Sequence, residues 1–353
     1  MTLLGALSRL FTLLIHCRAK LSLYFLRPFC NRLRENHSTV SEKITQLQRL
    51  ALIRCIMPRI FTRDASIVID LHCHLLPGLD DGPRDIAVSL AMARIAVAEG
   101  TEILACTPHI LPGLYHNSGL AIREATARLQ TILNEQLIPL RLVPGADVHV
   151  CPDFAARLRS GKLLSLADSR YVLIEPPHYT APPQLEVFFS HLMGNGYVPI
   201  LTHPERLAWL PPRYEMVQRL ARSGVWMQVT ASSFTGAFGR SALYWAERML
   251  DEGYVHLIAT DAHDVELRPP DLAKGREAVA KRVGAPEAHR LVVTRPLGIL
   301  NNEPPSSLPQ PLGVADVDLA RAGAQPDQKG TRQRSNCAER VVGLSRRLRQ
   351  LFK

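Results

Sequence analysis

The chain has 353 residues, 46% of them hydrophobic and 21% charged, which is enough for one large domain or two small ones with a sizeable core. Its seven cysteines are scattered and include no CxxC pair, which argues against a disulfide framework or a structural zinc knuckle and is typical of a reducing compartment. The net charge of +10 belongs to the ends, since residues 1–60 carry +8, residues 303–353 carry +4 and residues 61–302 carry −2. The near-neutral middle argues against nucleic-acid binding there.

Residues 1–60 form a basic, apolar N-terminal extension whose first part raises a question of targeting. Its apolar run is interrupted by Arg9 and is too short to span a bilayer. Three interpretations remain open: a signal peptide, although no clear small-residue cleavage site follows; a basic helix on a membrane surface; and a translation start downstream, near Met57. At the other end, residues 303–353 are rich in Pro, Gln, Ser and Arg, which predicts a disordered basic tail after a domain that spans 61–302.

Between these ends, strand-like runs alternate with segments of helical periodicity. In chain order, the predicted strands and the helices that follow them are 66–71 and 84–100, 102–108 and 120–136, 140–148 and 152–161, 171–177 and 183–196, 197–204 and 214–224, 225–231 and 240–253, and 255–263 and 271–284. Alternation of this length predicts a parallel α/β sheet. Seven units suggest a closed barrel, with an open doubly wound sheet as the alternative, and periodicity does not decide between the two.

Imidazoles and carboxylates stand at the carboxyl ends of six of the seven predicted strands. The first strand ends in IDLHCH, where the i, i+2 spacing points His72 and His74 to the same side. The later strands end with His109, Asp147, Glu175, His203, and the pair Asp261 and His263. The sixth strand supplies Thr230 and Ser232, which are not strong metal ligands. In a β/α barrel these ends converge on one face, where active sites lie.

This convergence predicts a metal centre. Imidazoles and carboxylates together suit borderline to hard divalent ions such as Mn, Fe, Zn or Mg. Eight or nine such side chains exceed one coordination sphere, so two or three bridged ions are expected; such ions activate water and polarise a phosphoryl or acyl oxygen. A lone strand-end histidine is more often a capping or core-edge residue, so no role is assigned to five others. These are His149, His178, His191, His256 and His289.

From about residue 67 to 300 the chain resembles the PHP (polymerase and histidinol phosphatase) superfamily. Within it, the chain is similar to the bacterial manganese-dependent protein-tyrosine phosphatases of capsule and exopolysaccharide synthesis. The segments that carry the resemblance are IDLHCHLLPGLDDGP, ACTPHI, VPGADVHV, IEPP, LTHPERL, QVTASSFTGAFG and IATDAHD. The resemblance implies a distorted (β/α)7 barrel with poorly structured N- and C-terminal extensions. It also implies two or three Mn²⁺ ions, with Fe, Zn, Mg and Co as the alternatives.

Carried over by position, the resemblance implies nine metal ligands: His72, His74, Asp81, His109, Asp147, Glu175, His203, Asp261 and His263. Asp81 is chosen over its neighbour Asp80. Asp147 stands where the family usually has the longer glutamate, which predicts that one metal is held more weakly. Ile110 stands where family members often have a second histidine, so any role of that histidine is lost here.

The resemblance also implies catalytic roles for Asp81, His203 and Arg206. The planar guanidinium of Arg206, in HPER, is expected to clamp phosphate bidentately. The alternative for this arginine is a surface salt bridge with Glu205. Water activated by the metal ions is expected to attack the phosphoryl group, and a covalent phosphoenzyme is not expected.

The predicted activity is that of a metal-dependent protein-tyrosine phosphatase, a cytoplasmic phosphoric monoester hydrolase. The expected partner is a phosphotyrosine protein, namely a bacterial tyrosine autokinase that couples the enzyme to polysaccharide export. No nucleic acid is expected to bind, and residues 1–60 are a candidate contact with the inner face of the membrane. One alternative is a small-molecule phosphatase of the histidinol-phosphate type or a nuclease. The other is a catalytically silent binding protein.

Overall fold

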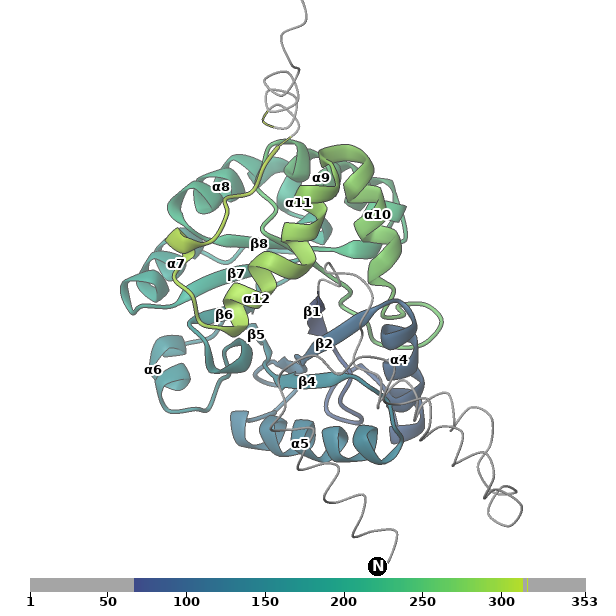
Figure 1. The fold of residues 1–353 in the computed structure, drawn as a ribbon. Helices are drawn as coiled ribbons and strands as arrows, with labels where there is room; N and C mark the ends of the chain where they lie inside the picture. Colours follow the sequence, from purple (N-terminus) through teal and green to yellow (C-terminus); the bar gives the residue numbers. More distant parts are fainter. Residues whose placement is uncertain (1–66, 314–315, 317–353) are drawn as a thin grey trace, which may run out of the picture. The chain divides into compact units, whose positions relative to one another are not determined.

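The computed structural model describes residues 67–313 and residue 316. The predicted N-terminal extension, residues 1–60, and the predicted tail beyond residue 316 lie outside these described residues. Within them, a curled parallel sheet runs through the fold and helices cover its outer side (Figure 1). The predicted distorted (β/α)7 barrel is therefore confirmed as the fold class.

The described residues contain nine strands, and all neighbouring strands pair in parallel. They are β1 (Val68–Cys73), β2 (Thr101–Cys106), β3 (His109–Ile110), β4 (Arg141–Pro144), β5 (Asp147–His149), β6 (Tyr171–Glu175), β7 (Val198–Thr202), β8 (Trp226–Thr230) and β9 (Leu257–Ala259). The orders are β1-β2-β4 and β3-β5-β6-β7-β8-β9. A parallel bridge between Cys73 and Ala262 links the end of β1 to the chain after β9, so the sheet curls back on itself.

The structure has two strands more than the seven predicted. The predicted strand 102–108 corresponds to β2 and is followed by the short additional strand β3, whereas the predicted strand 140–148 is divided into β4 and β5. Backbone hydrogen bonds cross both breaks, after β2 and after β4, because Gly145 N donates to Cys106 O (3.0 Å) and Asp147 N donates to Pro108 O (3.3 Å). The strands therefore bend without opening the sheet, and His109 is paired with Asp147 in the register of β3 and β5.

The helices follow the strands in the predicted alternation. They are α4 (Ile86–Ala98), α5 (Gly119–Glu135), α6 (Phe154–Arg159), α7 (Leu185–Gly194), α8 (Leu210–Ser223), α9 (Gly239–Asp251) and α10 (Leu272–Val283). The side chain of Asp85 caps α4 by accepting from Val88 N, and Ser118 caps α5 by accepting from Ala121 N. Caps of this kind each contribute about 1 kcal/mol, and they fix where the helices begin after the loops at the carboxyl ends of the strands.

The core explains why polar groups gather at one end of the barrel. Along β6, alternate side chains face the same side of the sheet. Tyr171 and Leu173 belong to one buried apolar cluster, whereas Val172 and Ile174 belong to the cluster that packs against the helices. Glu175 is next on the side of Tyr171 and Leu173, where the apolar filling stops. The carboxyl end of the strand therefore delivers its carboxylate into the mouth of the barrel.

Residues 285–313 form an additional closing segment for which no elements were predicted. It contains α11 (Ala285–His289), a π-helical turn (Arg290–Thr294) and α12 (Arg295–Leu300). The buried guanidinium of Arg295 donates to Glu287 Oε1 (2.6 Å) and to the carbonyls of Pro309 (2.7 Å) and Gln310 (2.8 Å). Leu308 is buried in the core, so the packed chain continues past the boundary predicted at residue 302.

Among the described residues, none of the helices has both the length and the apolar character that a membrane crossing requires.

Candidate metal centre

The first group of predicted ligands forms where β1 meets the end of β9. His72 Nε2 lies 3.3 Å from His74 Nε2, so the two rings are on the same side of the strand, as the i, i+2 spacing predicts. Asp261 Oδ1 is 3.3 Å from His72 Nε2 and 3.4 Å from His74 Nε2. Asp147 Oδ2, at the start of β5, is 3.5 Å from His72 Nε2. The curl of the sheet therefore brings together groups from its first and last strands.

Glu175, the last residue of β6, is the centre of the second group. Its carboxylate oxygens lie 3.3 Å from His109 Nδ1 and 3.4 Å from His203 Nε2, and both of these histidines were predicted ligands. His178 Nε2 is 2.8 Å from the same carboxylate, and His149 Nε2 pairs with it as well. Four imidazoles therefore surround one carboxylate.

Asp81 forms the third group at the exposed edge of the centre. Its Oδ1 lies 3.3 Å from His263 Nε2 and 3.6 Å from His109 Nε2. The Asp81 side chain is 47% exposed, whereas that of His263 is 5% exposed. Among the predicted ligands, Asp81 therefore lies where solvent and a substrate can reach the centre.

The ligand atoms fall into four overlapping sets, and within each set all atoms lie within 4.8 Å of one another. The sets are His74, Asp81, His109 and His263; His72, His74 and Asp147; His109, His149 and Glu175; and Glu175, His178 and His203. His74, His109 and Glu175 each belong to two sets. Shared ligands of mixed nitrogen and oxygen type are what a multinuclear centre requires.

Some buried atoms of these sets lack hydrogen-bond partners within the described part of the chain, which is consistent with metal ligands. Asp147 Oδ2 and His109 Nδ1 lie 3.6 Å apart, yet neither has a hydrogen-bond partner among the described residues. Burial, followed by the nearby charge of Glu175, raises the pKa of Asp147 well above its usual range. An unsatisfied buried carboxylate is costly, and a divalent cation held by these side chains would remove that cost.

Outer hydrogen bonds orient the histidine rings. His74 Nδ1 lies 2.6 Å from Asp80 Oδ2, and His72 Nδ1 lies 2.8 Å from Gln228 Oε1. In each ring Nδ1 is held by this outer hydrogen bond and Nε2 faces the centre. Outer partners of metal-binding histidines orient the ring in this way. The two adjacent aspartates therefore have different positions. Asp80 is the hydrogen-bond partner of His74 on the side away from the centre, whereas Asp81 contributes its Oδ1 to a ligand set.

Asp261 is surrounded by cationic and imidazole groups that compensate its charge. Burial alone would raise its pKa, but His72, His74, Arg268 and Arg206 outweigh burial and hold the pKa of Asp261 well below its usual range. Asp261 therefore remains a carboxylate at the mouth of the barrel.

Most of the histidines are held neutral. Burial lowers the pKa of His72 to about 4 and that of His109 to about 3. Neutral rings keep a lone pair for a metal ion. His74 differs, because burial is outweighed by the Asp80 and Asp261 carboxylates, which raise its pKa to about 10. A divalent cation would replace that proton at Nε2.

Two predicted ligands lie on a left-handed backbone. His203, directly after β7, has φ 34°, and Asp261, two residues after β9, has φ 50°. This region costs a residue with a side chain of order 1 kcal/mol or more, and such residues cluster at functional sites. The strain turns both side chains towards the centre at the point where each strand ends.

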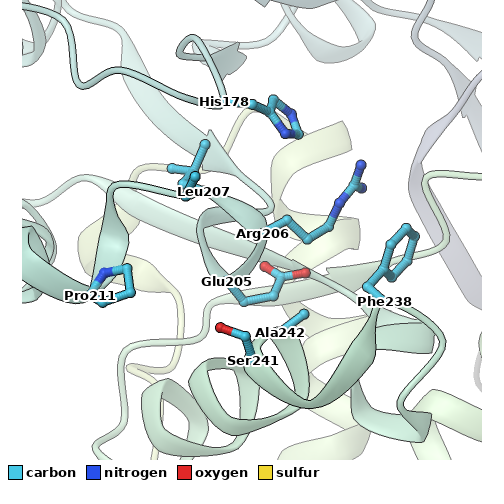
Figure 2. A pocket seen from close by; sticks show the side chains of 9 residues that line it. His178, Glu205, Arg206, Leu207, Pro211, Phe238, Ser241 and Ala242 are labelled. Atoms are coloured by element: carbon cyan, nitrogen blue, oxygen red, sulfur yellow. The ribbon is translucent and has the colours of Figure 1, made fainter.

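Two arginines meet at the edge of the centre. Arg206 Nη1 donates to Asp261 Oδ2, and Arg268 Nη2 donates to the same oxygen over 2.6 Å. The Arg206 guanidinium also lies 4.3 Å from the ring centroid of Phe238, and Figure 2 shows its side chain extending between His178 and Phe238. The two guanidinium groups therefore form a cationic edge beside the ligand sets.

A hollow of about 260 Å³ adjoins Arg206 and is lined in part by His178 and Phe238 (Figure 2). The alternative partner of Arg206, Glu205, is buried and accepts hydrogen bonds from Thr230 N (3.0 Å) and Ser233 Oγ (2.8 Å). Among the described residues, the ion pair of Arg206 is with Asp261 and not with Glu205.

Three residues without a predicted role lie at the centre: His149, His178 and Arg268. A signal for His149 was present, since it follows Asp147 by two residues in β5 and so faces the same side. His178 and Arg268 lie in loops, and no periodicity indicates where a loop side chain points. His256, by contrast, stacks on Trp226 away from the ligand sets, as expected of a structural histidine.

Comparison with known proteins places this barrel and its centre in a family. Residues 68–301 match the family described as capsular polysaccharide synthesis, CpsB/CapC, and the chain belongs to that family. It is 34% identical to the tyrosine-protein phosphatase YwqE of Bacillus subtilis over 69% of this chain and 96% of that protein. It is 27% identical to the tyrosine-protein phosphatase CpsB of Streptococcus pneumoniae over 67% of this chain and 99% of that protein.

The fold is similar to a solved structure from work on YwqE of Bacillus subtilis and CpsB of Streptococcus pneumoniae, which that work describes as metal-dependent tyrosine phosphatases. The TM-score is 0.64 at 33% sequence identity, and the match covers 69% of this chain and 99% of that one.

Proposed function

We propose that this protein is a metal-dependent protein-tyrosine phosphatase that hydrolyses phosphotyrosine in a protein of capsule or exopolysaccharide synthesis. The observation that carries the proposal is the set of four overlapping ligand groups at the carboxyl ends of the strands, with two arginines at their edge. Relatives that match this chain over nearly their whole length are named tyrosine-protein phosphatases. The activity is therefore supported by the chemistry of the site and by descent.

The centre is proposed to hold two or three Mn²⁺ ions through the nine predicted ligands, with His149 and His178 as additional candidates. Mixed imidazole and carboxylate donors suit Mn²⁺, and they also suit Fe, Zn, Mg and Co, so elemental analysis must decide the metal. When bound, the ions supply a Lewis acid that activates water and polarises the phosphoryl group.

The side chains of the chain itself have the following roles in this proposal. Arg206 and Arg268 exchange their shared partner, Asp261 Oδ2, for the oxygens of the phosphate dianion and hold it in place. His263 and His109 outweigh burial and keep the pKa of Asp81 below its usual range. The ionised Asp81 carboxylate would then hold an ion through one oxygen and accept a proton from water through the other. His203 is neutral, and its Nε2 lies 3.4 Å from Glu175 on the buried side of the centre, where it would serve as a metal ligand.

The proposed protein substrate is a bacterial tyrosine autokinase, which the family description supports only through its reference to capsule synthesis. The cytoplasm is the proposed compartment. The three free, buried cysteines Cys73, Cys106 and Cys151 agree with reducing surroundings. Contact of residues 1–60 with the membrane surface remains a proposal from the sequence.

A substrate panel tests the function. The protein is stripped of metal, reloaded with Mn²⁺ and assayed with a phosphotyrosine peptide, the matched phosphoserine peptide, histidinol phosphate and single-stranded DNA. The proposal expects Mn-dependent release of phosphate from the phosphotyrosine peptide at a kcat/KM well above that of the other three. Preferential hydrolysis of histidinol phosphate or DNA would assign the site to the alternative classes, and no turnover at full metal content would indicate a silent binding protein.

A further inference from the structure

Three loops at the mouth of the barrel carry large apolar side chains that point into solvent. They are Leu114 after β3, Tyr179 after β6 and Leu267 after β9, with exposures of 63%, 88% and 86%. Tyr179 and Leu267 are the most exposed large hydrophobic residues in the described part of the chain. A single exposed apolar residue needs no explanation, but each of these three is adjacent in the chain to a residue that contacts the centre, namely Tyr115, His178 or Arg268. We call the three the apolar rim.

Leu114 is fixed beside the centre by a tight turn. Its neighbour Tyr115 stacks on His109, with ring centroids 5.7 Å apart. Tyr115 N donates to Leu111 O (2.9 Å), and Leu111 N donates back to Tyr115 O (3.1 Å). Asn117 Nδ2 donates to His109 O (2.9 Å) and ties the loop to the ligand itself. The exposed leucine is therefore held on an ordered support.

Tyr179 follows His178, whose Nε2 lies 2.8 Å from the Glu175 carboxylate. The backbone carbonyl of His178 accepts a hydrogen bond from Ala208 N (2.9 Å), which ties this loop to the segment that carries Arg206. The tyrosine ring is thus placed at the rim, one residue from the metal centre.

Leu267 precedes Arg268, one of the two arginines that meet Asp261. Asp264 Oδ1 accepts from the backbone N–H groups of Glu266 (2.7 Å), Leu267 (2.6 Å) and Arg268 (3.2 Å). Three hydrogen bonds to one oxygen fix the turn with Leu267 at its tip. This loop, too, presents an apolar side chain from a rigid base.

The loops are already ordered, so an incoming chain that covers these side chains gains apolar contact without the cost of ordering the loops. In the proposed function the phosphate of the substrate binds Arg206 and Arg268, so the residues on either side of the phosphotyrosine are the groups nearest to the rim. A free phosphomonoester is too small to cover all three side chains. On the basis of the proposed function, we propose that the apolar rim docks the peptide residues flanking phosphotyrosine and selects apolar neighbours.

The test compares two triple variants on two substrates. The rim variant carries Leu114→Ser, Tyr179→Ser and Leu267→Ser. The matched control removes two aliphatic side chains and one tyrosine that are also exposed but lie elsewhere on the fold. Its substitutions are Leu137→Ser, in the loop before β4, Val187→Ser on α7 and Tyr244→Ser on α9. Each Mn-loaded protein is assayed with a phosphotyrosine peptide that has apolar flanks and with free phosphotyrosine.

The rim variant is expected to raise the KM for the peptide about tenfold with kcat retained, and to hydrolyse free phosphotyrosine within about twofold of the parent, since burying a side chain lowers the free energy of binding and not of the chemical step. The control variant should match the parent on both substrates. A peptide KM unchanged in the rim variant, or an equal loss on both substrates, would overturn docking while leaving the phosphatase function intact.

Two other outcomes would also rule out the docking proposal. If the parent hydrolyses neither phosphotyrosine compound, the proposed function fails and the rim proposal fails with it. If sedimentation shows that the parent self-associates and the rim variant does not, the rim is an interface between copies of this chain, and the docking proposal is wrong.

Discussion

Exchange of Asp80 or Asp81 for asparagine tests whether the two neighbours have different roles. We expect Asp80 to orient the ligand His74 and Asp81 to be a metal ligand itself. Asp80 Oδ2 lies 2.6 Å from His74 Nδ1 and accepts from His109 N over 2.9 Å, while Asp80 Oδ1 accepts from Gly82 N over 3.0 Å. An asparagine at position 80 has one oxygen for these three donors, so each orientation of its amide leaves an N–H group facing another N–H group.

The magnitude follows from that unpaired donor. A buried donor without a partner costs about 1–3 kcal/mol, and loss of an outer partner of a metal ligand typically lowers metal affinity about 10- to 100-fold. Asp80→Asn should therefore need about 10- to 100-fold more Mn²⁺ for half-maximal turnover and should recover its kcat when Mn²⁺ saturates. Asp81→Asn replaces a charged ligand, which is also the proposed proton acceptor, by a neutral amide, so its kcat should stay low at any Mn²⁺ concentration.

The assay is turnover of a phosphotyrosine peptide against Mn²⁺ concentration, with bound metal measured by elemental analysis. Asp85→Asn is the matched control, because Asp85 is the exposed N-cap of α4 and asparagine caps a helix as well as aspartate does. The reasoning is refuted if saturating Mn²⁺ restores Asp81→Asn while Asp80→Asn remains inactive and short of metal.

Three further predictions concern Asp147, Arg206 and His256. Asp147 Oδ2 already lies 3.5 Å from His72 Nε2 and the side chain is fully buried, so Asp147→Glu should not tighten Mn²⁺ binding and should lower the free energy of unfolding by about 1–3 kcal/mol through overpacking. Arg206→Ala should lower kcat/KM by roughly 10- to 100-fold at unchanged metal content, because a charge-assisted hydrogen bond to phosphate is lost, and Arg206→Lys should lose less. Burial and the charge of Arg295 lower the pKa of His256 to about 3, so its protonation favours the unfolded chain. The contribution of His256 to stability is complete above its unfolded pKa of about 6.5 and falls by about 3 kcal/mol between pH 7 and pH 4.

Each of these has a contrary outcome. Tighter Mn²⁺ binding by Asp147→Glu would support the expectation that the shorter aspartate holds its metal weakly. Full activity of Arg206→Ala would leave Arg206 as an ion-pair partner of Asp261 alone. For His256, urea unfolding of metal-free parent and His256→Asn is compared at pH 7 and pH 4, and an equal loss of stability in both proteins would contradict a titrating role for His256.

The positions at strand ends were predictable because two simple periodicities determine them. A β-strand alternates its side chains, and parallel strands of a barrel share one carboxyl edge, so His72, His74, Glu175 and Asp261 reach the same place whatever the details of packing. The order of the helices was predictable from helical periodicity, since α5 and α10 have apolar stripes that begin after a capping residue.

The features that were not predicted depend on tertiary contacts. The break between β4 and β5 falls at Gly145, whose backbone bonds across to another strand. The closing helices α11 and α12 are short and contain Pro286 and Pro296 near their first turns. They are stabilised by the buried Arg295–Glu287 pair, which no local pattern reveals. Loop residues such as Arg268 reach the centre only because distant groups fix the loop.

The measurement that tests the central claim most directly is the dependence of phosphotyrosine hydrolysis on the number of metal ions bound per chain. Metal-free protein is titrated with Mn²⁺, and turnover of the peptide and bound metal are measured on the same samples. Shared ligands and four overlapping ligand sets predict that turnover appears only as two or three ions bind, and that His74→Ala, which removes a residue common to two sets, loses both metal and turnover while remaining folded. Full turnover of the metal-free protein, or of His74→Ala with its full metal content, would contradict the assignment of this centre as the site of hydrolysis.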